Sequence, residues 1–188
     1  GVDIVDIGLC STPSFYWATQ NYPAGVMVTA SHNPGKYNGF KICKNGAGPV
    51  GEVNGMKDIA KLALEGIFPE SKRRGSYSEE YVMDGYLKFN LSFLKTDKPF
   101  KIVIDAANGM GGYEYEKLLP LLPRSFEIIP MFFEPDGTFP NHEANPLNTE
   151  TLHGLQKRVM EEAADIGVAI DGDGDRIVFI DDTGRVIS

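Results

Sequence analysis

Cysteines and long apolar runs are scarce in this sequence, and each scarcity narrows the class of protein. Two cysteines are too few for a disulfide scaffold, so we expect Cys10 and Cys43 to be small packing residues in a reducing cytoplasm. No apolar run reaches the length of about 18 residues that a membrane-spanning helix needs. The opening residues, GVDIVDIGL, lack a basic segment ahead of an apolar core, so we expect no signal peptide.

A surplus of positive charge is also missing. The 188 residues include 18 Lys and Arg against 26 Asp and Glu, a net charge of −8. This balance provides no basic surface for a phosphate backbone, and we expect neither nucleic acid nor a membrane as a partner. The charge is unevenly spread: residues 1–75 hold 8 basic and 6 acidic side chains, whereas residues 76–188 hold 10 and 20. The contrast indicates two units with different electrostatic roles.

Patterns typical of strands and of helices alternate along the chain. Apolar runs or alternation predict strands at 2–9, 25–30, 40–43, 101–105, 126–133, 165–170 and 177–181. Helices are predicted at 54–64, after an N-cap at Ser78, at 113–122, and from a Thr149 cap to 164. From residue 78 this α-β-α-β-α-β-β order favours a mainly parallel sheet covered by helices, closed by an antiparallel hairpin.

Residues 69–77 are polar and lack periodicity, and we interpret them as a linker. The prediction is therefore two α/β units, residues 1–75 and 76–188, each a mainly parallel mixed sheet covered by helices, with the boundary near 74–77. The chain begins without Met and inside a strand-like alternation. We expect it to be a piece of a longer chain.

The sharpest chemical signal is the run DGDGDR at 171–176. Carboxylates at alternate positions of an extended segment share one face and repel one another unless a cation holds them. The glycines permit a tight loop, and oxygen-only ligands select a hard cation such as Mg²⁺. An EF-hand loop needs Gly at its sixth position and Glu at its twelfth, where this chain has Arg176 and Asp182. A solvated acidic turn is the other alternative.

A second signal is the run TASHNP at 29–34. Ser31 leaves a buried valine-rich strand directly into a rigid polar loop beside His32, which is how a nucleophilic or phosphate-carrying hydroxyl is presented. Taken alone the run is equally compatible with a plain turn, because the G-x-S-x-G elbow of hydrolases is missing.

Other polar residues are expected to be structural. The glycine-rich segment 108–112 resembles a dinucleotide-binding loop, but Glu114 stands where the last glycine belongs, so we expect a tight turn between strand and helix. We expect His142 to be a polar loop residue, His153 to lie on a helix surface, and Asp105 to act as a turn or capping group.

The two signals occur together with YNGFK at 37–41 and PDGTFPNHEANPLNTETL at 135–152. This combination resembles the α-D-phosphohexomutase family, and within it the phosphomannomutase/phosphoglucomutase branch. The resemblance implies a four-domain enzyme, of which this chain matches the later part of the first domain and the whole second domain. The missing domains of the same chain would be its partners.

The resemblance also implies a site. It implies that Ser31 carries a phosphoryl group and that Mg²⁺ is held by Asp171, Asp173, Asp175 and an oxygen of the phosphoserine. It further implies that His32 and Lys41 take part in proton transfer or phosphate contact, and that Arg176 lies near the phosphoserine, so that Ser31, His32, Lys41 and Arg176 would form the catalytic group. The whole enzyme would interconvert hexose 1-phosphate and hexose 6-phosphate of mannose or glucose, with a sugar bisphosphate as intermediate and activator.

Two alternatives stay open: a phosphoglucosamine mutase, although YNGFK favours the mannose/glucose branch, and a non-catalytic module that binds Mg²⁺ or phosphate. The turn at Asn38-Gly39 predicts a hairpin that returns Lys41 toward Ser31. We expect nearby positive charge to lower the pKa of Lys41. We also expect the aspartate loop to lie outside the core, and this chain alone to be inactive.

Overall fold

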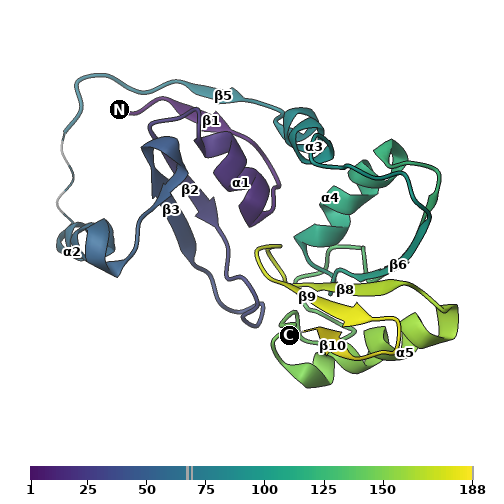
Figure 1. The fold of residues 1–188 in the computed structure, drawn as a ribbon. Coiled ribbons are helices and arrows are strands. Elements are labelled where there is room, and N and C mark those ends of the chain that lie inside the picture. The colour runs from purple at the N-terminus through teal and green to yellow at the C-terminus, as the bar shows by residue number, and fades with distance from the viewer. Residues whose placement is uncertain (67, 69, 188) are drawn as a thin grey trace.

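The computed structural model describes residues 1–66, 68 and 70–187 and has an α/β fold, as the sequence predicts (Figure 1). The N-terminal part contains β1 Ile4–Asp6, α1 Thr12–Thr19, β2 Ala24–Val28, β3 Phe40–Lys44, β4 Gly48–Pro49 and α2 Lys57–Glu65. A short strand follows, β5 Tyr77–Glu79. The C-terminal part contains α3 Met83–Leu91, β6 Phe100–Asp105, α4 Met110–Leu118, β7 Phe126–Met131, α5 His153–Glu162, β8 Ile166–Ile170, β9 Ile177–Asp181 and β10 Val186–Ile187. None of the helices in the described ranges has the length and apolar character needed to cross a bilayer.

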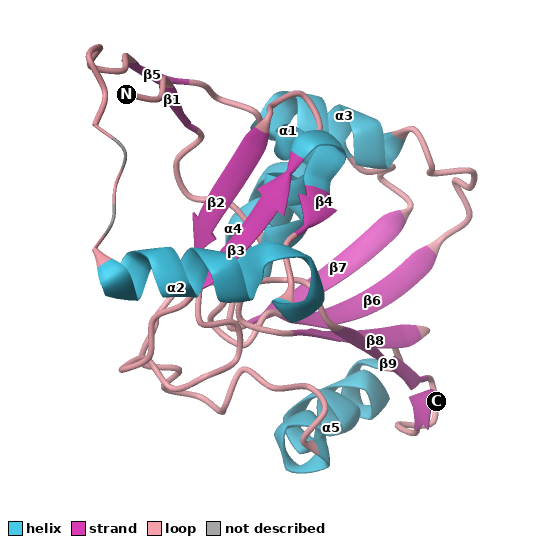
Figure 2. Cartoon of the chain, turned by 90° about the vertical axis from the view of Figure 1, so that its left-hand side faces the viewer, coloured by secondary structure: helices cyan, strands magenta, loops and turns pink. Residues whose placement is uncertain are grey.

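The C-terminal part is built on a five-stranded sheet in the order β10-β9-β8-β6-β7. β6 pairs in parallel with β7 and β8, and β8 pairs antiparallel with β9, which confirms the predicted parallel sheet and closing hairpin. Helix α5 covers one face, α4 lies on the other, and α3 lies beside α1 (Figure 2). Successive residues of β6 serve the two faces: Val103 packs under α5, and Ile104 packs on the α4 side.

The chain order of this sheet reverses direction between β6 and β8. From β6 the chain passes through α4 to β7 on one side, and then through α5 to β8 on the other side. Such a reversal opens a space beyond the carboxyl ends of the two diverging strands, where ligands of open α/β sheets bind. Asp105 ends β6 and Asp171 directly follows β8, so the DGDGDR loop begins at this edge.

The N-terminal part is held by a β2–β3 hairpin that packs on α1. Met27 and Cys43 point to the inner face and form a small core with Phe15 of α1. In the antiparallel register Lys41 lies opposite Met27, so both residues face inward. The hairpin itself is confirmed and directs Lys41 toward the C-terminal part, but residues 29–39 join its strands and not a tight turn at Asn38-Gly39. The β2-β3-β4 sheet is antiparallel, which corrects the mainly parallel sheet predicted for residues 1–75.

The prediction that Ser78 caps a helix is wrong. Residues 77–79 instead form β5, which pairs in parallel with β1, Ile4 lying opposite Tyr77. The helix begins later, at Met83, after Val82. The backbone of β1 provides pairing partners that lie more than 70 residues away in sequence, and a local sequence pattern does not reveal them. Of the predicted linker, residue 69 lies outside the described residues, and the predicted boundary near 74–77 stays a prediction.

Two other helix starts differ from the predicted positions. α2 begins at Lys57 rather than after Asn54, because Gly55 has a left-handed φ of 137° that interrupts the helix. Its predicted end at Gly66 is confirmed, with φ at 64°. A short 3-10 helix, Thr149–Leu152, leads into α5, and Asn148 rather than Thr149 caps it: the Asn148 side chain accepts a hydrogen bond from the backbone N–H of Glu150.

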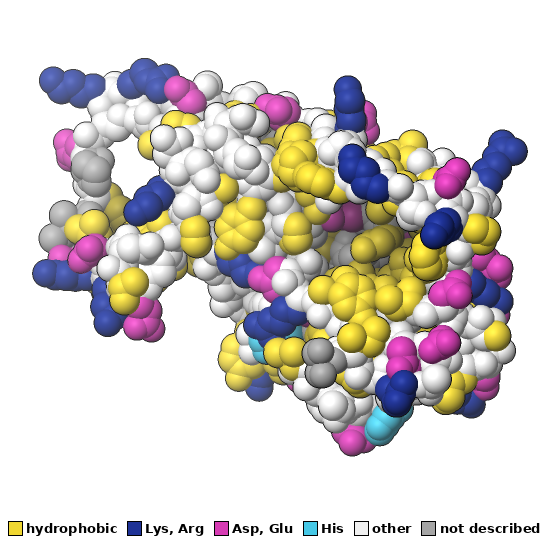
Figure 3. Space-filling view, viewed as in Figure 1, with side chains coloured by type: hydrophobic (Ala, Val, Ile, Leu, Met, Phe, Trp, Pro, Cys, Tyr) yellow, Lys and Arg dark blue, Asp and Glu magenta, His cyan; other side chains and the backbone are white. Residues whose placement is uncertain are grey.

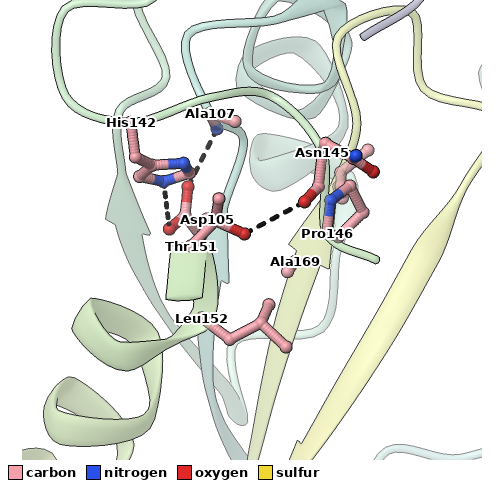
Figure 4. A pocket seen from close by; sticks show the side chains of 9 residues that line it. Asp105, Ala107, His142, Asn145, Pro146, Thr151, Leu152 and Ala169 are labelled. Atoms are coloured by element: carbon pink, nitrogen blue, oxygen red, sulfur yellow. Dashed lines mark hydrogen bonds and ion pairs between the residues drawn. The ribbon is translucent and has the colours of Figure 1, made fainter. Parts of the chain in front are cut away.

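A histidine anchors the long loop after β7 to the sheet edge (Figure 4). His142 Nε2 lies 2.9 Å from Oδ2 of the buried Asp105, whose Oδ1 accepts a hydrogen bond from the N–H of Ala107. The predicted turn role of Asp105 is therefore confirmed, but its pairing with His142 was not foreseen. The His142 ring also packs edge-on against Phe132. The pair fixes the loop beside the edge where the DGDGDR segment begins.

This pair predicts a pH-dependent stability. The hydrogen bond to Asp105 raises the pKa of His142 and outweighs the opposing effect of burial. A raised pKa stabilises the fold fully below the unfolded value of about 6.5, and the contribution is lost as the pH rises through the folded pKa. We therefore expect His142→Gln to lower the free energy of unfolding by roughly 1.5–3 kcal/mol at pH 5.5 and by less at pH 9.

Urea unfolding at the two pH values measures this difference. His153→Gln is the matched control, because His153 lies exposed on α5. An equal loss of stability at both pH values would rule out the charged pair.

Candidate functional site

Three aspartates converge in the loop after β8. One carboxylate oxygen from each of Asp171, Asp173 and Asp175 lies within 4.8 Å of the others. Asp171 and Asp173 are buried, so the expectation that this loop lies outside the core is wrong. The loop enters the junction between the two parts of the chain, because α1 and the β2–β3 hairpin pack over it.

Glycines allow the loop to approach its neighbours this closely. A Cβ atom on Gly172 would lie 2.4 Å from the backbone oxygen of Ser31, so a side chain there would force the two loops apart. Gly174 has a φ of +81°, a left-handed conformation that disfavours other residues. The glycines of the motif therefore serve the close contact between its loop and Ser31 as well as the turn.

Asp173 is the best-supported of the three carboxylates. Its Oδ2 accepts hydrogen bonds from the hydroxyls of Thr12, at 2.8 Å, and Thr29, at 2.9 Å, and pairs with Lys41 Nζ at 2.7 Å. Its Oδ1 is buried and has no hydrogen-bond partner among the residues that the structure describes. A buried carboxylate oxygen normally has a partner. The oxygen, together with the neighbouring carboxylates, fits a hard cation held by this loop.

The neighbouring groups shift the pKa values of two aspartates in opposite directions. Burial raises the pKa of Asp171, and the charges of Asp173 and Asp175 add to the rise. Burial also disfavours the charged form of Asp173, but the hydrogen bonds from Lys41, Thr12 and Thr29 outweigh it and lower its pKa. Three carboxylates this close repel one another, and a bound cation would relieve the repulsion.

The pKa of Lys41 shifts in the direction opposite to the predicted one. Burial favours its neutral form, but hydrogen bonds to Asp173 and Asp175 outweigh burial and raise its pKa. The expected lowering is wrong, because the nearest charges to this amine are the two carboxylates and not Arg176. Nζ also donates to the hydroxyl of Thr12 at 3.0 Å. Lys41 is therefore a cation seated on the acidic loop.

Ser31 lies directly against the acidic loop. Its Oγ donates a hydrogen bond to Asp171 Oδ2 at 3.0 Å and lies 3.3 Å from His32 Nδ1. The residue has a left-handed φ of 54°, and its N–H is held by the Thr29 hydroxyl at 2.9 Å. A serine in this conformation is strained, and such strain is common where a side chain must be presented in a fixed direction.

Arg176 joins the two loops. Its backbone N–H donates to Asp171 Oδ1 at 3.0 Å, and its guanidinium Nη1 lies 2.9 Å from Nδ1 of His32. A guanidinium can only donate, so Nδ1 of His32 is the acceptor of this bond. Figure 3 shows basic, acidic and histidine side chains gathered at the junction of the two parts.

All seven residues named from the sequence therefore meet in one place. Two threonines that bind Asp173, Thr12 and Thr29, were not foreseen. Thr29 belongs to the TASHNP run and could have been included on that ground. The sequence around Thr12 is typical of an ordinary polar turn. Thr12 binds Asp173 only because α1 packs against the acidic loop.

Comparison with known proteins gives this arrangement a context. A model of phosphoglucomutase/phosphomannomutase α/β/α domain II matches residues 79–184, and one of α/β/α domain I matches residues 1–69. The chain belongs to the phosphoglucomutase/phosphomannomutase family. The resemblance read from the sequence motifs is thus confirmed.

Individual relatives agree. The chain is 38% identical over its whole length to a phosphomannomutase of Salmonella montevideo and 40% identical to a protein named "Phosphohexose mutases" of Xanthomonas campestris pv. campestris (strain B100). It also superposes over its whole length, with a TM-score of 0.87 and 34% identity, on a crystal structure of a family protein from Burkholderia thailandensis. It covers 43%, 42% and 42% of these three proteins respectively, so it spans less than half of their length.

Proposed function

We propose that the whole protein interconverts hexose 1-phosphate and hexose 6-phosphate, with mannose and glucose as the sugars, through a phosphoserine at Ser31. The observation that carries the proposal is the 3.0 Å contact between Ser31 Oγ and Asp171, which joins the candidate phosphoryl carrier to the acidic loop. The names of the relatives, phosphomannomutase and phosphohexose mutase, support the reaction class and the sugar.

Mg²⁺ is the cation that we propose for the acidic loop. Asp171, Asp173 and Asp175 would hold it with an oxygen on Ser31, and a ligand role is supported by Oδ1 of Asp173, which has no hydrogen-bond partner in the described part of the chain. When bound there, Mg²⁺ would neutralise charge on the phosphoryl oxygens. Without a cation, the net acidity of residues 76–188 would repel a dianionic sugar phosphate.

The transfer itself requires alignment and proton movement more than covalent chemistry by other side chains. Phospho-Ser31 would give its phosphoryl group to a sugar hydroxyl: the Oγ–P bond breaks, a sugar O–P bond forms, and the proton lost by the sugar hydroxyl ends on Oγ. His32 Nδ1, 3.3 Å from Oγ, would move that proton once Arg176, which donates to the same nitrogen here, turns to the phosphoryl group. Arg176 and Lys41, both cationic, would offset charge on the transferred group.

Assays of the full-length protein test the sugar. Phosphomannose and phosphoglucose isomers are expected to interconvert in the presence of Mg²⁺ and a sugar bisphosphate. Turnover of glucosamine phosphate in preference to both would overturn the proposed sugar while leaving the reaction class intact. Binding of Mg²⁺ or phosphate without turnover of any hexose phosphate would overturn the mutase itself.

The chain by itself is expected not to turn over. The proposed mechanism needs the bisphosphorylated sugar to reorient so that either phosphate can face Ser31, which requires a second anion grip and a site closed to water. We expect no product from residues 1–188 with glucose 1-phosphate, Mg²⁺ and glucose bisphosphate in a coupled assay, and an active full-length protein under the same conditions. Sustained turnover by the chain at a typical enzymatic rate, on the order of 1–10³ per second, would show that these residues suffice.

A further inference from the structure

A buried carboxyl group away from the acidic loop has three hydrogen bonds that the proposed reaction does not use. Glu114 lies on α4 and is 8% exposed. Its Oε1 accepts from the backbone N–H of Ser11 at 2.9 Å and from the hydroxyl of Ser14 at 2.5 Å, and its Oε2 accepts from the hydroxyl of Ser11 at 2.8 Å. All three donors belong to the first turn of α1, about 100 residues earlier in the chain.

The two serines are themselves part of the helix start. Ser11 is the N-cap of α1, and its hydroxyl accepts from the N–H of Ser14 at 3.2 Å. Both serines are buried. The beginning of α1 is thus bound on one side by a carboxyl group from the C-terminal part of the chain. A negative charge at this place also interacts favourably with the positive end of the helix dipole.

On its other side the same turn binds the acidic loop. Thr12, the residue between the cap and Pro13, donates its backbone N–H to the Asp173 carbonyl at 2.8 Å and its hydroxyl to Asp173 Oδ2 at 2.8 Å. Gly174 packs against the Ser11 side chain as well, since a Cβ placed there would lie 3.2 Å from that of Ser11. Glu114 and Asp173 therefore hold neighbouring residues of one rigid turn.

The geometry points to Glu114 as a positioning residue for the acidic loop, acting through Ser11 and Thr12. By fixing the first turn of α1 on α4, it sets where Thr12 meets Asp173, and so which oxygen of Asp173 stays available to a cation. Lys41 and Ser31 reach the loop from the same N-terminal part, so the same contact sets their register with the loop. The expected effect on Mg²⁺ affinity rests on the proposed function, whereas the expected effect on the position of Thr12 does not.

The test uses amide hydrogen exchange by NMR together with calorimetric Mg²⁺ titration. In Glu114→Gln, exchange of the Thr12 amide is expected to accelerate at least about tenfold relative to the amide of Val103 in the buried strand β6. Because Val103 reports global opening, this ratio separates local release of the turn from a general loss of stability. The dissociation constant for Mg²⁺ is expected to rise by about tenfold.

Two further variants make the test specific. Glu116→Gln removes the same charge from an exposed position of the same helix and is expected to change neither readout. The double variant Ser11→Ala/Ser14→Ala, which changes no charge, is expected to shift both readouts as Glu114→Gln does. Combining it with Glu114→Gln should shift them little further, because both changes remove the same hydrogen-bond network. If Glu114→Gln does not fold, Ser14→Ala removes a single donor and should move both readouts in the same direction by less.

A Thr12 amide in Glu114→Gln that keeps its protection relative to Val103 would overturn the proposal. An unchanged Mg²⁺ affinity in that variant, with affinity measurable in the parent, would overturn it too. If the parent chain itself binds no Mg²⁺, the proposed metal fails, and the Thr12 amide alone then decides whether Glu114 positions the turn.

Discussion

Asp173→Asn is expected to raise the dissociation constant for Mg²⁺ by about a hundredfold or more. Near a protein surface, a carboxylate and a unit charge about 4 Å apart attract one another by about 4 kcal/mol, and an oxygen of Asp173 would be a direct ligand of the cation. Asn keeps an oxygen that can accept from Thr12 and Thr29, whereas Ala would leave both buried hydroxyls without their acceptor. The change in affinity can therefore be measured on a folded protein by calorimetry.

The same variant tests how the loop is integrated in the fold. Loss of the ion pair with Lys41 is expected to lower the free energy of unfolding by about 1–3 kcal/mol, measured by urea titration. Asp182→Asn is the control, because Asp182 carries the same charge just beyond the motif and is exposed. Unchanged Mg²⁺ affinity in Asp173→Asn would contradict the proposed site.

Ser31→Ala in the full-length protein is expected to reduce turnover on the order of a thousandfold or more, because no other oxygen would carry the phosphoryl group. Intact-mass measurement after incubation with glucose bisphosphate should show one added phosphoryl group in the parent and none in the variant. Ser78→Ala, at an exposed serine on β5, should leave both results unchanged.

Competing hydroxyls lie close by, so the position of the phosphoryl group must be mapped. Ser11 and Thr12 are buried and engaged with Glu114 and Asp173, whereas Ser31 is partly exposed near the start of the loop after β2. Accessibility and the contact with Asp171 both favour Ser31. A phosphoryl group found on Ser11, Thr12 or Thr29 would show that the wrong hydroxyl has been chosen.

Much of the candidate site could be predicted from short sequence runs. The DGDGDR run indicates a cation site without further information, because carboxylates this close in the sequence repel one another unless a cation is bound. The TASHNP run places Ser31 after a buried strand, and the structure does bring these two runs into contact.

What the runs could not predict is how burial and distant partners change their chemistry. The pKa of Lys41 rises instead of falling, because the folded chain seats the amine on two carboxylates. Thr12 and Glu114 have no recognisable motif, and each acquires a role only from a partner more than 100 residues away. The strand at residues 77–79 likewise forms only because the chain returns to pair with β1, more than 70 residues earlier in the sequence.

By itself the sequence determined the α/β class, the order of strands and helices in the C-terminal part, and the residue types available for phosphoryl transfer. It could do so because hydrophobic periodicity, turn residues and carboxylate spacing act over a few neighbouring positions. The tertiary structure alone decided that Asp171 and Asp173 of the acidic loop are buried, which oxygen of Asp173 has no partner among the described residues, and that Glu114 holds the start of α1. Burial, desolvation and hydrogen bonding depend on which distant segments pack together, and no short stretch of sequence contains that information.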